Sequence, residues 1–433
     1  MTSPAVTFTP DLSRRDLTLD LARVTAVVFV VVVHLLQVGI GPGPDGTLVA
    51  SRPAETQPWF DAATWVGQIM PLFFVVGGFA SAAGWASWTA KGGDASGFVR
   101  TRTLRLAQPA VPLFVFLAVV LGGASLVGVA PELVDAAAVG AGMPLWFLAA
   151  YLLCQAGVPL LAHLHARVPR ATMMALLAGV VAVDALRYAT GIEQIGLINL
   201  VFVWPLVQQI GFWYHDGWFD RRSPWTLLAI ASAGYLVLGA LVAWGPYSTS
   251  MLANLNPPTL PLVVLGVAQA CLLRIARPAL TALMRTRVMR GVVFLLGSRL
   301  MTVYLWHLPV ILVLSGISLL IPGAAPTPAT PAWWWTRPVL FVIVLVALWA
   351  LSLFLVRFEA LGRLGATPSP FVVGTAWLCA FVPPFVVMEW SMNVVFAVGG
   401  AVLLAMAVPL LRRAPGKTLT PQVPAAREKR AHA

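Results

Sequence analysis

The sequence predicts an all-α membrane protein, a polytopic bundle of about 12 transmembrane helices with both termini in the cytoplasm. Of its 433 residues, 59% are hydrophobic and only 10% are charged. A soluble protein of this length needs far more charged surface, so lipid must be the solvent for most of the exterior. The lengths of the apolar runs and the placement of the basic residues between them support the same conclusion.

Twelve apolar runs are long enough to cross a membrane. A bilayer core of about 30 Å needs about 20 apolar residues in a helix, and helices are required because lipid cannot bond the backbone. The ninth run is long enough to be tilted or kinked. The runs lie near residues 17–40, 60–88, 107–129, 144–164, 171–189, 196–214, 224–244, 257–275, 291–321, 337–356, 371–390 and 393–411.

Basic residues indicate the orientation. If the N-terminus is cytoplasmic, the cytoplasmic segments hold 23 of the 28 Lys and Arg residues, and the outer loops hold three. This is a strong positive-inside bias, and it favours an even number of spans. The net charge of +12 is then explained by topology and by anionic membrane lipids, so we expect no nucleic-acid partner.

The first predicted helix carries three ionisable residues. Arg23 and His34 are eleven residues apart, which places them on one face of a helix about 16 Å apart. Asp20 lies three residues before Arg23 and can pair with it. Charged groups inside a membrane are costly, so the pair is a candidate for lining a path between the two sides. In the alternative interpretation, Arg23 snorkels to the surface and His34 bonds a neighbouring helix.

Two other segments carry candidate site residues. Arg100, Arg102 and Arg105 lie in a predicted cytoplasmic loop and suit the phosphates of a nucleotide-bearing donor, although contact with lipid would also explain them. The ninth span holds Arg299, Tyr304 and His307. Tyr304 and His307 are three residues apart and therefore neighbours on one face. They are candidates for the cavity, or for an ordinary bond between helices.

These features together resemble the acyltransferase 3 family of membrane-bound acyltransferases. Gly77 stands where that family usually has serine. The matching motifs follow in order: Arg23 with His34, Pro71–Phe79 for the "PLFFxxSGF" motif, Arg100–Arg102 with Arg105 and Pro109, Leu145–Leu148, and Tyr304–His307 for the "YLxH" motif.

The resemblance implies a ten-helix core followed by two extra helices. It divides the chain into a cytoplasmic N-terminal segment (1–16), an acyltransferase 3-like transmembrane domain (17–360), two extra transmembrane helices (371–411) and a disordered basic cytoplasmic tail (412–433). The polar, proline-containing composition of the tail is the basis for expecting disorder there.

The resemblance also implies an activity. An acyl group, most simply acetyl, would move from cytoplasmic acyl-CoA to a hydroxyl of an extracytoplasmic or lipid-linked glycan or a related acceptor. Arg100, Arg102 and Arg105 would hold the phosphates of the donor, and Arg23 would position it. His34 would be a general base or a transient acyl carrier.

This activity needs no bound cofactor and no metal ligand set. The expected partners are acyl-CoA as donor substrate, the acceptor and membrane lipids. Usage rich in Ala, Val, Pro and Arg points to a bacterial cell membrane. A secondary transporter or exporter is the main alternative, because twelve spans with both ends inside suit that class too. A glycosyltransferase fits less well, because the outer loops are short and contain few acidic residues.

Overall fold

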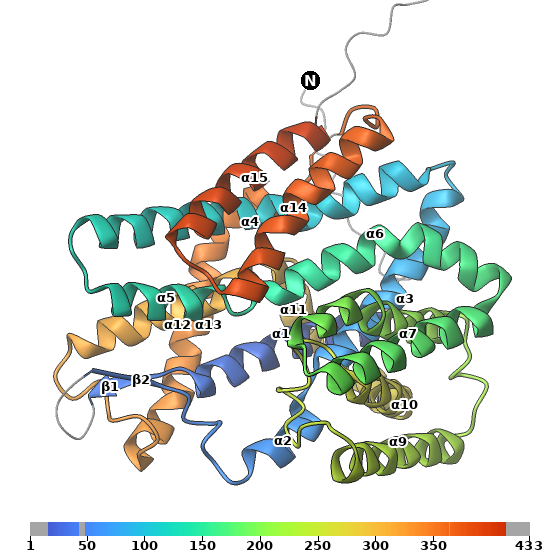
Figure 1. Ribbon diagram of the computed structural model, residues 1–433, viewed down its shortest axis with the longest axis horizontal. Helices are drawn as coiled ribbons and strands as arrows, with labels where there is room; N and C mark the ends of the chain where they lie inside the picture. The colour runs from blue at the N-terminus through green and yellow to red at the C-terminus, as the bar shows by residue number, and fades with distance from the viewer. Residues whose placement is uncertain (1–15, 43–47, 363, 413–433) are drawn as a thin grey trace, which may run out of the picture.

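The computed structural model describes residues 16–42, 48–362 and 364–412, and it is built almost entirely of helices (Figure 1). The predictions for the N-terminal segment and for the basic tail lie outside the described residues, except for Asp16 and Arg412. The helices are α1 (Leu17–Gln37), α2 (Phe60–Gly67), α3 (Met70–Thr89), α4 (Ala95–Leu126), α5 (Pro131–Gly142), α6 (Leu145–Arg167), α7 (Pro169–Thr190), the 3-10 helix η2 (Glu193–Val201), α8 (Val203–His215), α9 (Pro224–Trp244), α10 (Leu260–Leu283), α11 (Arg287–Gly297), α12 (Leu300–Leu319), α13 (Pro331–Glu359), α14 (Pro370–Trp390) and α15 (Val394–Arg412).

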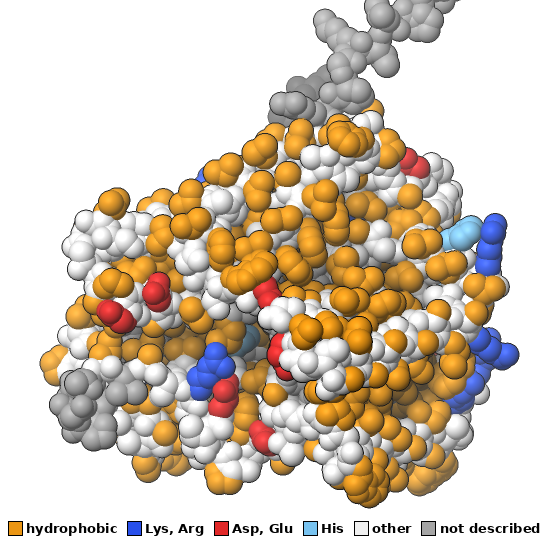
Figure 2. All heavy atoms as spheres, viewed as in Figure 1, with side chains coloured by type: hydrophobic (Ala, Val, Ile, Leu, Met, Phe, Trp, Pro, Cys, Tyr) orange, Lys and Arg blue, Asp and Glu red, His pale blue; other side chains and the backbone are white. Residues whose placement is uncertain are grey.

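The predicted fold class is confirmed. Within the described residues, 12 helical segments are long and apolar enough to cross a membrane, and each overlaps one predicted span. Most of the long helices run across the view in Figure 1. Figure 2 shows hydrophobic side chains over most of the visible face, with basic side chains gathered at its right-hand edge. The side of the membrane that each terminus faces stays a prediction.

The basic segment before the third span is helical, and the prediction of a loop there is wrong. Helix α4 begins at Ala95, where the carboxylate of Asp94 accepts a hydrogen bond from the backbone N–H of Gly97. An N-cap of this kind satisfies one of the unpaired donors of the first turn. The arginines of this segment therefore have fixed helical spacing, which decides which of them can face the same cavity.

Several predicted spans are interrupted. The second consists of α2 and α3, which are separated at Gln68 and Ile69, and the ninth breaks at Ser298 and Arg299. A short helix, α5, precedes the fourth span and was not predicted. A small antiparallel hairpin of β1 (Gly39–Pro42) and β2 (Leu48–Ser51), in which Gly39 pairs with Ser51, was not predicted either. This hairpin follows α1 directly, and β1 contacts α12.

Glycines allow α3 and α8 to pack with their backbones in close contact. A Cβ atom at Gly78 would overlap the backbone carbonyl of Gln208, and one at Gly211 would overlap the carbonyl of Val75. Small residues at such crossings are a common packing device in membranes, where no hydrophobic force drives helices together. This contact fixes α3, which lies beside the helix that carries Arg23 and His34.

The last two helices are integrated into the bundle. Helix α15 packs on α4, and α14 packs on both α15 and α6. The Arg100 side chain joins them, because its Nε donates to the Leu411 carbonyl at 2.7 Å and its Nη1 donates to the Gly365 carbonyl at 2.7 Å. The Leu411 carbonyl lies in the last turn of α15, where carbonyls lack partners within the helix, so the buried guanidinium satisfies it; Gly365 lies between α13 and α14.

Candidate functional site

Two cavities lie along helix α1. The histidine cavity has a volume of about 420 Å³ and is lined by His34, whereas the basic cavity has a volume of about 160 Å³ and is lined by Arg23. The side chains that line both cavities form a septum between them: Val30, Met70, Phe147 and Tyr304. The structure therefore places Arg23 and His34 at adjoining chambers on one helix, and only a thin layer of side chains separates the chambers.

His34 is paired with His307, which is fully buried. The two ring nitrogens, Nδ1 of His34 and Nε2 of His307, are 2.8 Å apart, and His307 Nδ1 lies 2.6 Å from the backbone carbonyl of Tyr304. A carbonyl only accepts, so His307 Nδ1 must carry a proton. In a neutral His307, Nε2 is then an acceptor for the N–H of His34 Nδ1. This assignment leaves a lone pair on His34 Nε2, on a ring that lines the cavity.

Tyr304 links this histidine pair to the septum. Its hydroxyl donates to the backbone carbonyl of Pro144, which lies between α5 and α6. Its ring contacts Phe147 edge to face, with the ring centroids 4.9 Å apart. Because the Tyr304 carbonyl also accepts from His307, one residue fixes both a wall of the septum and the tautomer of the buried histidine. The sequence predicted Tyr304 as a residue of one cavity; in the structure it lines both chambers.

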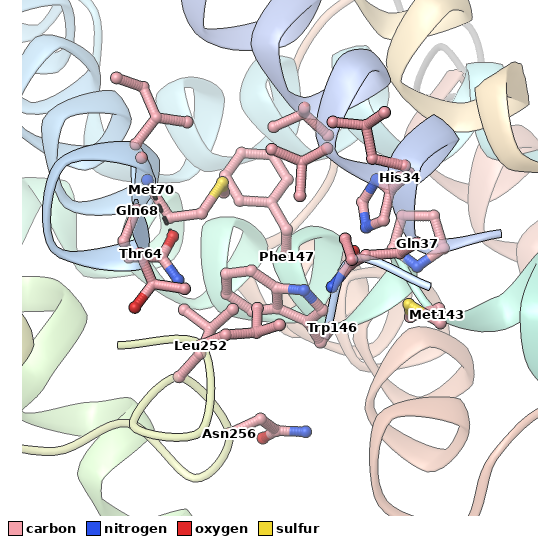
Figure 3. Close-up of a pocket in the computed structure, with 18 of the residues that line it drawn as sticks. His34, Gln37, Thr64, Gln68, Met70, Met143, Trp146, Phe147, Leu252 and Asn256 are labelled. Atoms are coloured by element: carbon pink, nitrogen blue, oxygen red, sulfur yellow. Dashed lines mark hydrogen bonds between the residues drawn. The ribbon is translucent and has the colours of Figure 1, made fainter. Parts of the chain in front are cut away.

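Figure 3 shows the histidine cavity in close-up. Trp146 and Phe147 of α6 lie between His34 and Gln37 of α1 and the group Thr64, Gln68 and Met70. Asn256 lies apart from these side chains, on the loop that follows α9. The break between α2 and α3 thus brings the polar side chains of Thr64 and Gln68 to a cavity that is also lined by the aromatic rings of Trp146 and Phe147.

The basic cavity gathers three arginines. Arg23 of α1 and Arg102 and Arg105 of α4 line it, and among the residues that the structure describes no acidic side chain does so. Arg23 and Asp20 form the predicted ion pair, with Nη1 and Oδ1 4.0 Å apart. Both side chains are about one-third exposed, so the pair neutralises Arg23 only weakly. A concave site with three cations and apolar walls attracts a polyanion.

Helical spacing separates the arginines of α4. Arg102 and Arg105 are three residues apart and share a face, whereas Arg100 is turned by about 200° from Arg102. Arg100 lies outside the lining of both cavities and is buried against the ends of the C-terminal helices. Arg102 also stacks over the ring of Phe98, 4.8 Å from its centroid.

The other two cavity candidates lie outside both linings. Arg299 donates from Nη1 to the hydroxyl of Ser352 at 3.0 Å, where it joins α12 to α13. Asp20 pairs with Arg23, which lines the basic cavity. The cavity roles of Arg299 and Asp20 therefore stay predictions. In the structure Arg299 makes a bond between helices, and Asp20 makes an ion pair within α1.

Two cavity residues on α6 were missed by the sequence analysis. Tyr151 and Gln155 line the basic cavity and follow Phe147 at intervals of four residues, so the three form one stripe. Gln155 donates to the hydroxyl of Ser81 at 2.9 Å. The absence of a side chain at Gly77 makes room for Tyr151, whose hydroxyl oxygen would lie 3.2 Å from an added Cβ. Polar side chains four residues apart in an otherwise apolar helix were the signal that could have identified them.

The fold and these chambers define a class: a multi-pass membrane protein with a buried histidine pair and a basic cavity arranged along one helix. A family model described as "Acyltransferase domain" matches residues 16–357, which is most of the chain, so the protein belongs to the acyltransferase 3 family. It is therefore a membrane acyltransferase. No curated protein and no solved structure matches the chain. Helices α14 and α15 lie beyond the matched residues.

Proposed function

We propose that the protein transfers an acyl group, most simply acetyl, from cytoplasmic acyl-CoA to a hydroxyl of an extracytoplasmic or lipid-linked glycan or a related acceptor. The observation that carries this proposal is the pair of adjoining chambers, one basic and one containing His34, which share a single septum. With the N-terminus in the cytoplasm, the basic cavity faces the donor and the histidine cavity faces the acceptor. The membrane is proposed to be a bacterial cell membrane.

The donor is held by its charge. Arg23, Arg102 and Arg105 would bind the phosphates of CoA, since guanidinium groups form bidentate bonds with phosphate oxygens. Arg100 is assigned no contact with the donor, because its bonds to Leu411 and Gly365 hold it at the C-terminal helices. The acyl thioester would then lie toward the septum, which the acyl group must pass to reach His34.

His34 supplies the chemistry at the acceptor. Its Nε2 takes the proton of the acceptor hydroxyl as the oxygen attacks the thioester carbon. A C–O bond forms, the C–S bond breaks, and the proton passes to the departing CoA thiolate. A covalent relay is the other version: Nε2 attacks the thioester carbon, an N–C bond forms, and the C–S bond breaks to release CoA thiolate. The acceptor oxygen then attacks the acyl carbon and the C–N bond breaks, and the hydroxyl proton passes through Nε2 to the thiolate. In both versions the bond from Nδ1 to His307 stabilises the charge that develops on the His34 ring.

A binding experiment tests the identity of the donor. Protein in lipid nanodiscs is heated with acetyl-CoA, or with acetylpantetheine, which has the same thioester and lacks the nucleotide phosphates. We expect acetyl-CoA to raise the melting temperature, because a ligand at 100 times its Kd stabilises the folded state by about 2.7 kcal/mol. Acetylpantetheine at the same concentration should have little effect. Equal shifts with both compounds, or no shift with either, would contradict the assignment of the basic cavity to acyl-CoA.

A further inference from the structure

The walls of the histidine cavity are mainly apolar. Aromatic and aliphatic side chains from seven helices (α1, α2, α3, α5, α6, α12 and α14) and from the segments between helices surround the space, among them Phe29, Phe60, Trp146, Leu252, Val387 and Met388. Its volume of about 420 Å³ is that of a small-molecule site. An occupant of this cavity must therefore bury much of its surface against hydrocarbon and aromatic rings.

Most polar groups in this cavity already bond within the protein. Gln37 Nε2 donates to Glu55 at 2.9 Å, and the Thr64 hydroxyl donates to the Asp61 carbonyl and accepts from Met251 N–H. Gln68 bonds two backbone groups in the same way. A sugar has a hydroxyl on nearly every ring carbon, and each one buried without a partner costs about 1–3 kcal/mol. This lining suits a ligand with one or few hydroxyls.

One wall of the cavity comes from outside the family-matched part of the chain. Val387 and Met388 of α14 and Ser391 and Met392 of the turn before α15 line it, whereas the match ends at residue 357. The turn packs on the end of α5, where a Cβ added at Gly142 would lie 2.5 Å from the Cβ of Met392. Helix α14 and the turn that follows it therefore complete the chamber into which His34 faces.

We propose that the acceptor is an alcohol whose reacting hydroxyl is carried by an apolar body, of the polyprenol kind, and that the wall formed by Met388 of α14 and Met392 of the following turn selects it. This inference rests on the proposed acyl transfer to a hydroxyl, and it assigns that hydroxyl to an apolar alcohol, a related acceptor, in place of a glycan. Met388 and Met392 are suited to the selection, because the unbranched thioether side chain adapts to irregular apolar surfaces. The hydroxyl reaches His34 Nε2, and the apolar body contacts the wall formed by these two residues.

Cross-linking tests the binding independently of turnover. A photoactivatable farnesol analogue is bound to the protein in nanodiscs, illuminated, and mapped by mass spectrometry. We expect labels on peptides that contain residues 143–147 and 385–392, competed by excess farnesol and not by maltotriose. Labelling spread over lipid-facing helices, or competition by maltotriose, would overturn the inference.

Variants at Met388, in the part of the wall that comes from α14, test the selection. Met388, which is half-buried, is replaced in Met388→Trp to fill the cavity, and Val402→Trp on the exposed face of α15 is the matched control. We expect Met388→Trp to weaken cross-linking at least tenfold and the control to leave it unchanged. Met388→Ala, which enlarges the space, is a second variant that keeps the test valid if the tryptophan variant misfolds. It should shift the labels without abolishing them. Unchanged labelling in both Met388 variants would overturn the role of this wall.

Activity separates this inference from the proposed function. Release of CoA from acetyl-CoA is measured with farnesol or maltotriose as acceptor, and the ester is identified by mass spectrometry. We expect the kcat/KM for farnesol to exceed that for maltotriose at least tenfold. Preferred acetylation of maltotriose would overturn the inference and leave the proposed function standing. Farnesol cross-linked in the cavity without release of CoA would overturn the proposed function and still support the binding of an apolar alcohol.

Discussion

Replacing His34 with alanine is expected to lower kcat by about 10²–10⁴-fold, the range typical of a lost general base, or to abolish turnover if the acyl group is carried on the ring. Binding of acetyl-CoA should be unchanged, because His34 lines the histidine cavity and not the basic cavity. The measurement is release of CoA by purified protein, with the melting temperature as the control for folding. Turnover near that of the unchanged protein would remove the proposed mechanism.

His307 should act through His34. In His307→Phe the N–H of His34 Nδ1 loses its acceptor, and we expect kcat to fall by about 10–100-fold, as for the loss of a bond worth 1.5–3 kcal/mol. His307→Gln supplies a carbonyl oxygen that can accept, so it should restore part of the rate. The double variant His34→Ala/His307→Phe should be no slower than His34→Ala alone, because residues that act as a unit are not additive. Independent, additive losses would argue that His307 is only a packing residue.

Replacing Arg102 or Arg105 with glutamine is expected to raise the KM for acetyl-CoA by about 10–100-fold each, because a hydrogen bond to a charged group contributes about 1.5–3 kcal/mol. The change in kcat should be smaller, since neither residue lines the histidine cavity. Arg170→Gln, at an exposed position at the start of α7, is the matched control for loss of a surface charge.

Arg100→Gln tests whether Arg100 binds the donor, as the motif alone implies, or only stabilises the fold, as its contacts indicate. Arg100 is 3% exposed and bonds two backbone carbonyls. Its loss should lower the melting temperature and leave the KM for acetyl-CoA close to that of the unchanged protein. A large rise in KM for Arg100→Gln, without a rise for Arg102→Gln, would reverse our assignment of the arginines.

The sequence predicted the membrane spans well because their signal is local. A run of about 20 apolar residues is by itself enough to predict a helix that crosses the lipid, and all 12 runs appear as helices. The spacing of Arg23 and His34 also sufficed to place them on one helix, because the rotation per residue is constant. The same rule, applied to α4, would have separated Arg100 from Arg102, but the segment was taken for a loop.

The partners of these residues could not be predicted. His34 and His307 are 273 positions apart, and only the packing of α1 against α12 brings their rings together. The septum could not be predicted for the same reason, since its residues come from four helices: Val30, Met70, Phe147 and Tyr304. No periodicity within one segment records which helix lies beside it. The wall formed by Met388 and Met392 was missed for the same reason, and the last two spans were expected only as additions to the core.

The central claim is that the two chambers are the donor and acceptor sides of one reaction across the membrane. The most direct test uses proteoliposomes with the Arg102 face of the protein outward, acetyl-CoA with a radiolabelled acetyl group outside, and the acceptor enclosed within. The account predicts labelled ester inside the vesicles and free CoA outside, with neither formed by His34→Ala. Ester formed only when donor and acceptor are on the same side would contradict it.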